Sequence, residues 1–397
     1  CKPLDPVDYL QRPNSPLPSW PITYEDVEPY QPKAAAWCEQ AGESFENDAI
    51  MADPATELLF DSGPQFRTRM FRFSPPTNFG KVYRQQIQDS TLIDAVYNAN
   101  LATMGSAEDA VTTATAVSPE GDQLEVQADR FVLAMGGIEN ARLLLHLADT
   151  TGGVFADPSE LLGACFMDHF GFSPGYLVSS EGLKHFRHQQ DGAPVLPAIT
   201  AREDFQVKKD LTSICLMATP DSPVAELPPA YFGNAGILGE ARENHSRYRL
   251  QLMVEPTAHT ASRIMLGQEK DAFGVPRVVL DWRVMEQDYL DTEKFLHEFA
   301  LSAGATGLGR VQRTRRFEGQ FRERLTGGMH HMGTTRMSDS PQFGVVDPDC
   351  RLHGSQNLYL AGSSVFPRVG YTNPTQTLVA LSERLADHLN GGGRDNA

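Results

Sequence analysis

Two adjacent histidines near the carboxyl end of the chain are the residues best suited to chemistry. His330 and His331 lie in the stretch Gly-Gly-Met-His-His-Met-Gly-Thr-Thr-Arg-Met, where small residues leave room for a bound molecule. A neutral imidazole can accept a proton near pH 7, because its unperturbed pKa is close to neutrality. Asn373 follows 43 residues after His330 (373 − 330). Its amide can hold an oxygen atom but cannot take a proton. The pattern indicates a single base with a polar partner, suited to an alcohol hydroxyl.

Two other readings of the histidine pair stay open on the residues alone. One histidine of such a pair can be buried and hydrogen-bonded while the other is exposed, with no role in catalysis. A metal site would add His353, but the chain offers no carboxylate or cysteine set at ligand spacing beside it. We therefore expect no metal.

A strand, a glycine turn and a helix are predicted upstream of these residues. Residues 131–135 form a continuous apolar run, as expected of a strand covered on both faces. Gly136 and Gly137 follow, and residues 138–147 have a helical pattern. Open α/β sheets present backbone N–H groups to a phosphate at such turns. A turn that only allows close strand–helix packing is the alternative.

A second strand and helix are predicted downstream of the histidines. Residues 358–361 are apolar and end at Gly362 and Ser363, and a helix is predicted over 375–389. Pro374 and Thr375 open that helix. Proline costs little in a first turn, and the free N–H groups there form a positive end.

These stretches together resemble the C-terminal signature of the glucose–methanol–choline (GMC) oxidoreductases. The shared motifs occur in the family's order: His-x-x-Gly-Thr, Arg-Met, Gly-Val-Val-Asp, Asn-Leu-Tyr, Gly-Ser-Ser-x-Phe-Pro and Asn-Pro-Thr. The resemblance implies FAD as cofactor, with oxidation of an alcohol group to a carbonyl by proton abstraction and hydride transfer to flavin N5. It assigns the base to His330 and its partner to Asn373. Asn at that position is similar to the pyranose-oxidase-like branch, which implies a sugar hydroxyl as substrate.

The resemblance also implies contacts with the cofactor and the substrate. Leu101 would face the adenine, and Gly136, Gly137 and Asn140 would line the flavin site. Gly362 and Ser363 would lie near the ribityl chain and pyrophosphate. Pro374 and Thr375 would lie at flavin N1 and O2, where the positive helix end stabilises the negative charge of reduced flavin. Glu255 and Arg263 would lie beside the substrate, and His169 would have a structural role.

The predicted fold class is a discontinuous, Rossmann-like α/β flavin-binding domain plus an α+β substrate domain with an antiparallel sheet. Further strands are predicted within 65–79 and 92–104, a hairpin over 111–126, and helices over 24–41 and 286–304. The antiparallel sheet is predicted from strands at 249–255, 263–266 and 277–282. The domain boundaries that follow are 1–84 for a cap segment, 85–164 and 331–392 for the flavin domain, 165–330 for the substrate domain and 393–397 for a tail.

Composition excludes several classes of protein. The 397 residues are 41% hydrophobic and 21% charged, which are ordinary globular values. A formal net charge of −17 opposes binding to nucleic acid or anionic lipid. No apolar run approaches the roughly 18 residues of a membrane span. The five cysteines contain no C-x-x-C pair, which favours a reducing, cytoplasmic location.

One expected family feature is missing from the sequence. No G-x-G-x-x-G fingerprint occurs between a strand and a helix. We expect an N-terminal βαβ segment that was removed or is a separate chain, rather than a lipoprotein beginning at a modified Cys1. A carbohydrate-binding remnant without flavin is the rival function. The electron acceptor is left open among oxygen, a quinone and a cytochrome.

Overall fold

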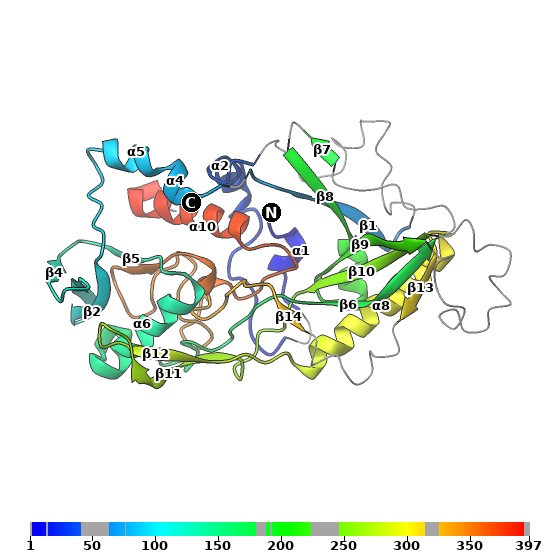
Figure 1. Cartoon of the computed structure of the whole chain (residues 1–397). Helices are drawn as coiled ribbons and strands as arrows, with labels where there is room; N and C mark the ends of the chain where they lie inside the picture. The colour runs from blue at the N-terminus through cyan, green and yellow to red at the C-terminus, as the bar shows by residue number, and fades with distance from the viewer. Residues whose placement is uncertain are drawn as a thin grey trace.

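The structure is a computed structural model (Figure 1). It describes residues 2–12, 15–40, 63–75, 77–179, 188–190, 193–223, 246–313 and 325–392.

An antiparallel sheet forms one half of the molecule, on the right of Figure 1. Its strands run in the order β1 (Phe66–Arg72), β8 (Ala193–Ala201), β9 (Ile214–Pro223), β10 (Ser246–Val254), β6 (Phe170–Ser179) and β13 (Arg310–Arg313), with β7 (His188–Gln190) on β8 and β14 (Thr326–Gly327) on β6. Helix α8 (Glu286–Ala305) packs against the sheet, where Phe295 and Phe299 contact Phe66 edge-on. The short helix α7 (Glu203–Lys209) adds Phe205 to the same core. The predicted antiparallel sheet and the helix at 286–304 are confirmed.

Two of the predicted strands lie outside that sheet. Strands β11 (Arg263–Lys270) and β12 (Pro276–Asp281) form a separate hairpin. The hairpin packs on α6 (Gly136–Thr150), at the lower left of Figure 1. The expectation that 263–266 and 277–282 join the antiparallel sheet was wrong. Strand spacing predicts that two strands pair with each other, but not which layer the pair covers.

The other half of the molecule is built around a parallel strand pair. Strand β5 (Phe131–Leu133) pairs in parallel with β15 (Leu358–Leu360), although the two are far apart in sequence. Helices α6 and α10 (Thr375–Asp387) share the same core with both strands. The strand–turn–helix pattern at 131–147 and the strand and helix after 357 are confirmed. One face of β5 differs from expectation, because Val132 is 43% exposed rather than covered.

A small antiparallel sheet of β2 (Asn100–Ala107), β3 (Ala110–Val117) and β4 (Gln123–Val126) lies beside this core. It confirms the hairpin predicted over 111–126. The strand predicted from residue 92 begins only at Asn100, and residues 91–100 are all exposed. Extended backbone becomes a strand only when a neighbour completes its hydrogen bonds. No neighbouring strand accompanies residues 92–99 within the described chain.

Short helices and turns connect these parts. They are α1 (Pro6–Tyr9), η1 (Glu28–Tyr30), α2 (Gln31–Trp37), α4 (Phe79–Val82), α5 (Arg84–Asp89), η2 (Gly153–Phe155), η8 (Ser363–Val365) and η9 (His388–Gly392). The helix predicted over 24–41 was too long, since α2 begins only at Gln31. Thr23 donates its N–H to Asp26 Oδ2 at 2.8 Å, so this pair closes a separate turn before the helix. Among the described helices, none has the length and apolar character to cross a membrane.

Candidate active site

His330 lies in a turn held between two antiparallel rungs. Met167 and Met332 exchange backbone hydrogen bonds at 2.9 and 3.0 Å on one side. On the other side, Gly327 in β14 pairs with Phe170 at the start of β6. Between these rungs, four residues (328–331) lie opposite only two (168 and 169). The turn therefore bulges away from the strand, and its first residues fold over Asp168.

The carboxylate of Asp168 fills the inside of this turn. It accepts the backbone N–H groups of Gly328 at 3.1 Å, Met329 at 3.2 Å and His330 at 2.8 Å. Met329 has a left-handed φ of 59°, which helps three successive N–H groups converge on one anion. This arrangement places the His330 backbone and leaves the Met329 side chain 85% exposed.

The His330 ring is held at both of its nitrogens. Nδ1 lies 2.8 Å from Nδ1 of His169, and Nε2 lies 3.0 Å from Nδ2 of Asn373. Nε2 of His169 lies 2.9 Å from the carbonyl oxygen of Gly370. The structure thus brings together His330 and Asn373, as the sequence predicted, and adds His169 behind them.

Burial keeps the His330 ring neutral near pH 7. Desolvation lowers the pKa of the half-buried His330, the charge of Asp168 opposes this, and His331 lowers it further. His169 is buried, which lowers its pKa to about 4, with His330 as the second cause. Two neutral imidazoles in contact avoid the repulsion of two cations. His330 is therefore available as a proton acceptor.

Asn373 reaches the site from the residues just before α10. Pro374 is the N-cap of this 13-residue helix, and its position at the helix start agrees with the sequence. The open first turn directs N–H groups toward the side on which Asn373 meets His330. Thr375 is partly exposed at this helix start. The arrangement fits a negative charge developing next to Asn373.

Two glycine turns lie at the carboxyl ends of the parallel strands. Gly136 follows β5 with φ 90°, and Gly362 follows β15 with φ 105°. A methyl group added at either position would meet no atom within 4 Å, so both turns border open space. Ligands of open α/β sheets bind at this end of the strands. These turns fit an extended cofactor with phosphate groups, as FAD is.

Asn140 joins the two turns. Its Oδ1 accepts the N–H of Met135 at 2.9 Å, and its Nδ2 donates to the Ala361 carbonyl at 3.1 Å and to Ser364 Oγ at 3.0 Å. The amide is thus engaged within the protein, between the ends of β5 and β15. A cofactor contact through Asn140 stays a prediction.

The remaining predicted cofactor residues take different positions. Gly137 packs so closely on the histidine turn that an added methyl group would lie 2.0 Å from the His331 carbonyl oxygen. Ser363 donates its hydroxyl to that same oxygen at 2.8 Å. Leu101 is partly buried on β2 and packs against the core that holds α6. Their cofactor roles stay predictions.

Glu255 is engaged inside the protein. Its carboxylate forms two bonds with Arg368, at 3.1 and 2.8 Å, and accepts the N–H groups of Val369 and Gly370 at 3.3 and 3.1 Å. The Arg368 guanidinium holds the pKa of this carboxyl to about 2, against the opposing effect of burial. Glu255 therefore anchors the loop that carries the Gly370 carbonyl.

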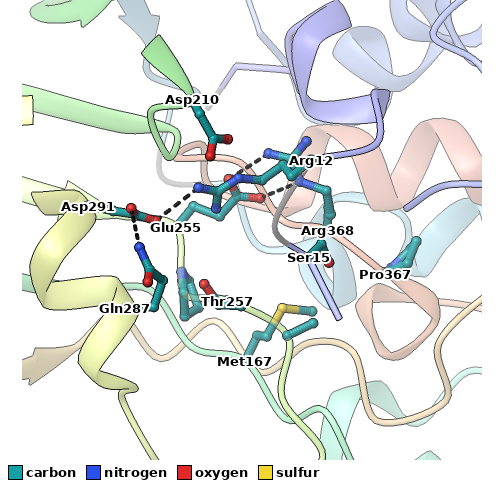
Figure 2. Close-up of a pocket in the computed structure, with 12 residues that line it drawn as sticks. Arg12, Ser15, Met167, Asp210, Glu255, Thr257, Gln287, Asp291, Pro367 and Arg368 are labelled. Atoms are coloured by element: carbon teal, nitrogen blue, oxygen red, sulfur yellow. Dashed lines mark hydrogen bonds and ion pairs between the residues drawn. The ribbon is translucent and has the colours of Figure 1, made fainter. Parts of the chain in front are cut away.

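The predicted substrate residues do not meet at His330. Arg263 begins β11, in the hairpin on α6, and its Nε lacks a hydrogen-bond partner among the described residues. Glu255 faces a polar cavity of about 30 Å³, which accommodates water but not a sugar ring. Figure 2 shows this cavity, with Arg12 directed to Asp291 and Arg368 to Glu255. The two substrate assignments remain predictions.

Three contributors to the site were not predicted as such. Asp168 holds the turn, His169 contacts the base, and Gly370 supplies the carbonyl behind it. The Asp-His pair was visible in the sequence as a recurrent stretch. Its contact with residues 328–330 was not, because about 160 residues separate the partners.

Comparisons with known proteins agree with this geometry. Residues 258–382 match the GMC oxidoreductase family, in its C-terminal domain. The chain is 28% identical over 296 residues to the fructose dehydrogenase large subunit of Gluconobacter japonicus, covering 71% of this chain and 51% of that protein. It is 27% identical over 321 residues to an oxygen-dependent choline dehydrogenase of Rhizobium johnstonii, covering 72% and 56%. The chain thus spans about half the length of these curated relatives.

A solved structure supports the fold. The pyridoxine 4-oxidase from Mesorbium loti superposes with a TM-score of 0.54 at 16% identity, covering 96% of this chain and 73% of that one.

Proposed function

We propose that this chain, whose residues 258–382 form the C-terminal domain of a GMC oxidoreductase, belongs to an FAD-dependent enzyme that oxidises an alcohol group to a carbonyl. The observation that carries the proposal is the pair His330 and Asn373, joined at 3.0 Å beside the start of α10. A neutral imidazole and an amide at that distance can share one substrate oxygen.

The protein residues supply binding and proton chemistry. Nε2 of His330 accepts the hydroxyl proton, and Asn373 donates a hydrogen bond to the same oxygen. Bound FAD supplies a hydride acceptor for this chemistry. The open turns at Gly136 and Gly362, with Pro374 and Thr375 at the start of α10, are the residues that would hold it.

A sugar hydroxyl is the proposed substrate within this class. The support is the similarity to the fructose dehydrogenase large subunit and the asparagine at position 373, which resembles the pyranose-oxidase-like branch. The similarity to choline dehydrogenases favours a different primary alcohol. Fructose, glucose and choline are therefore the substrates to compare.

A further polypeptide segment is proposed to cover the exposed side of β5. Val132 is 43% exposed there, and the apolar residues of the neighbouring extended stretch are also exposed: Leu92, Ile93, Val96 and Tyr97. Parallel sheets normally have both faces covered. Native mass spectrometry of the purified protein would show a second chain bound with FAD. A single 397-residue chain that retains FAD would contradict this proposal.

A cytoplasmic location is also proposed. It is supported by the four cysteines at described positions, which are buried free thiols. Cell fractionation would test it.

The visible spectrum of the purified protein tests the main proposal. We expect flavin absorption bands that bleach when fructose or glucose is added without oxygen. His330→Ala should bind flavin equally well and slow its reduction by about 10²–10⁴-fold, the range for losing a general base. Flavin reduction at the wild-type rate in this variant would overturn the role of His330. Sugar binding with no flavin bands would favour the non-catalytic remnant.

A further inference from the structure

Three contacts connect the side of His330 that faces away from Asn373 to a backbone carbonyl. His330 Nδ1 meets His169 Nδ1 at 2.8 Å, and His169 Nε2 meets the Gly370 oxygen at 2.9 Å. Each of these contacts needs one hydrogen between its two heavy atoms. The position of each hydrogen can be deduced in order, beginning at the carbonyl.

A carbonyl oxygen only accepts hydrogen bonds, so Nε2 of His169 must carry a hydrogen. His169 is 1% exposed and neutral, so its other nitrogen, Nδ1, has a lone pair instead. The 2.8 Å contact is then a hydrogen bond only if His330 donates from Nδ1. A neutral His330 with a hydrogen on Nδ1 has its lone pair on Nε2, where Asn373 donates its amide hydrogen.

We infer that His169 is a positioning residue that selects the tautomer of His330 whose Nε2 can accept the substrate proton. The inference concerns the hydrogen on His330, and its catalytic consequence rests on the function proposed above. His169 does not touch the substrate oxygen in this scheme. It acts through the ring of His330 alone.

The carbonyl at the start of this chain of bonds is itself held firmly. Gly370 donates its N–H to Glu255 at 3.1 Å, and Glu255 is paired with Arg368. Gly370 has φ 55°, and an added methyl group would lie 2.5 Å from Asp8 Oδ2. The loop therefore accepts only glycine at this position without strain. A rigid acceptor is what a tautomer selector requires.

The other ring partner could not make the same selection alone. An asparagine side chain can present either its NH₂ or its oxygen to Nε2 after a simple flip, and so accommodates both tautomers. Gly370 has no such freedom. The preference therefore originates at the carbonyl and reaches His330 through His169.

Nitrogen-15 NMR of the histidine side chains tests the inference directly. Protonated and unprotonated ring nitrogens differ strongly in chemical shift, and the His330 signals are identified by their loss in His330→Gln. In the wild-type protein without substrate, we expect His330 Nδ1 to be protonated and Nε2 to be unprotonated. A hydrogen on Nε2 would overturn the inference without recourse to any variant at position 169.

Two variants at position 169 form a matched pair. In His169→Asn, the side-chain oxygen occupies the place of Nδ1 and can still accept from His330. In His169→Gln, the terminal amide occupies the place of Nε2, so the acceptor for His330 is lost. We expect the Asn variant to keep the wild-type His330 tautomer and the Gln variant to show both tautomers. The Gln variant should also reduce flavin about tenfold more slowly at saturating substrate, with little change in KM.

The outcomes separate this inference from the proposed function. Expected tautomers combined with wild-type flavin reduction in His330→Ala would overturn the base role and leave the His169 assignment standing. Slow reduction in His330→Ala combined with an unchanged His330 tautomer in His169→Gln would overturn the His169 assignment alone. Circular dichroism of each variant confirms that the comparison is made between folded proteins.

Discussion

The carboxylate of Asp168 accepts the backbone N–H of His330 at 2.8 Å, so the proposed base is placed by its main chain as well as by its ring. The same carboxylate also binds the two preceding N–H groups. One buried-side anion therefore shapes the turn and places a negative charge near the imidazole. This double role makes Asp168 the first residue to alter.

Asp168→Asn should lower the pKa of the base. The negative charge at position 168 favours protonated His330, so removing it makes the cation less stable and lowers its pKa below its already lowered value. The acidic limb of the pH–rate profile for flavin reduction should move to lower pH. The amide would also direct N–H toward backbone N–H groups, so the maximal rate should fall by about tenfold. Asp281→Asn, an exposed position paired with Arg283, should leave the profile unchanged. An unmoved limb in Asp168→Asn would exclude this coupling.

Gly328→Ala should disturb the contact between the two imidazoles. An added methyl group would lie 2.9 Å from His330 Nδ1 and 3.3 Å from His169 Cβ. The rings must separate to accommodate it, so flavin reduction should slow by about tenfold. Gly80→Ala in α4 is the control, because its nearest neighbour would be 3.5 Å away. Equal rates in the two variants would show that the close approach is unimportant.

Glu255→Gln should destabilise the fold strongly. It would leave the Arg368 guanidinium, 8% exposed, without its bidentate partner. Breaking a buried ion pair on one side costs about 3–5 kcal/mol of unfolding free energy. Glu293→Gln is the matched control, since its pair with Arg313 is exposed and worth less than about 1 kcal/mol. Urea denaturation measures both, and similar losses in the two variants would contradict the buried-pair argument.

Asp8→Asn should make stability less dependent on pH. Burial, with Glu255 and Asp5 as further causes, raises the pKa of Asp8 to about 7, whereas the unfolded chain has the ordinary value near 3.8. Because the folded pKa is the higher one, this group's contribution to stability is present below pH 4 and lost as pH rises toward 7.

The amide has no such titration and can still bond to Ser213 and to the Asp5 N–H, as the carboxyl does. Relative to wild type, the variant should gain on the order of 2–4 kcal/mol between pH 4 and pH 8. Urea denaturation at both pH values measures the gain, with the exposed Glu120→Gln as control. A difference independent of pH would show that Asp8 is charged in the folded protein across this range.

Local patterns predicted several elements correctly. The strand and glycine turn before α6, the hairpin of β3 and β4, and the long helix α8 follow from apolar periodicity and from glycine or proline at their ends. These signals lie within about 20 residues of chain, so no distant partner is needed to interpret them. The helix predicted at 24–41 failed on the same scale, because its interior prolines allow a helix to begin but not to continue through them.

The sequence by itself also determined the two residues that face the substrate, since His330 and Asn373 were recognisable from residue type, spacing and motif. Only the tertiary structure decided what holds them. Asp168 and His169 meet the histidine turn from about 160 residues away, and Glu255 is neutralised by an arginine 113 residues downstream. A carboxylate has the same appearance in a sequence whether it binds a ligand or an internal arginine. Its partner is set by chain packing, because desolvation makes an unpaired buried charge too costly and long-range contacts alone determine which charges meet.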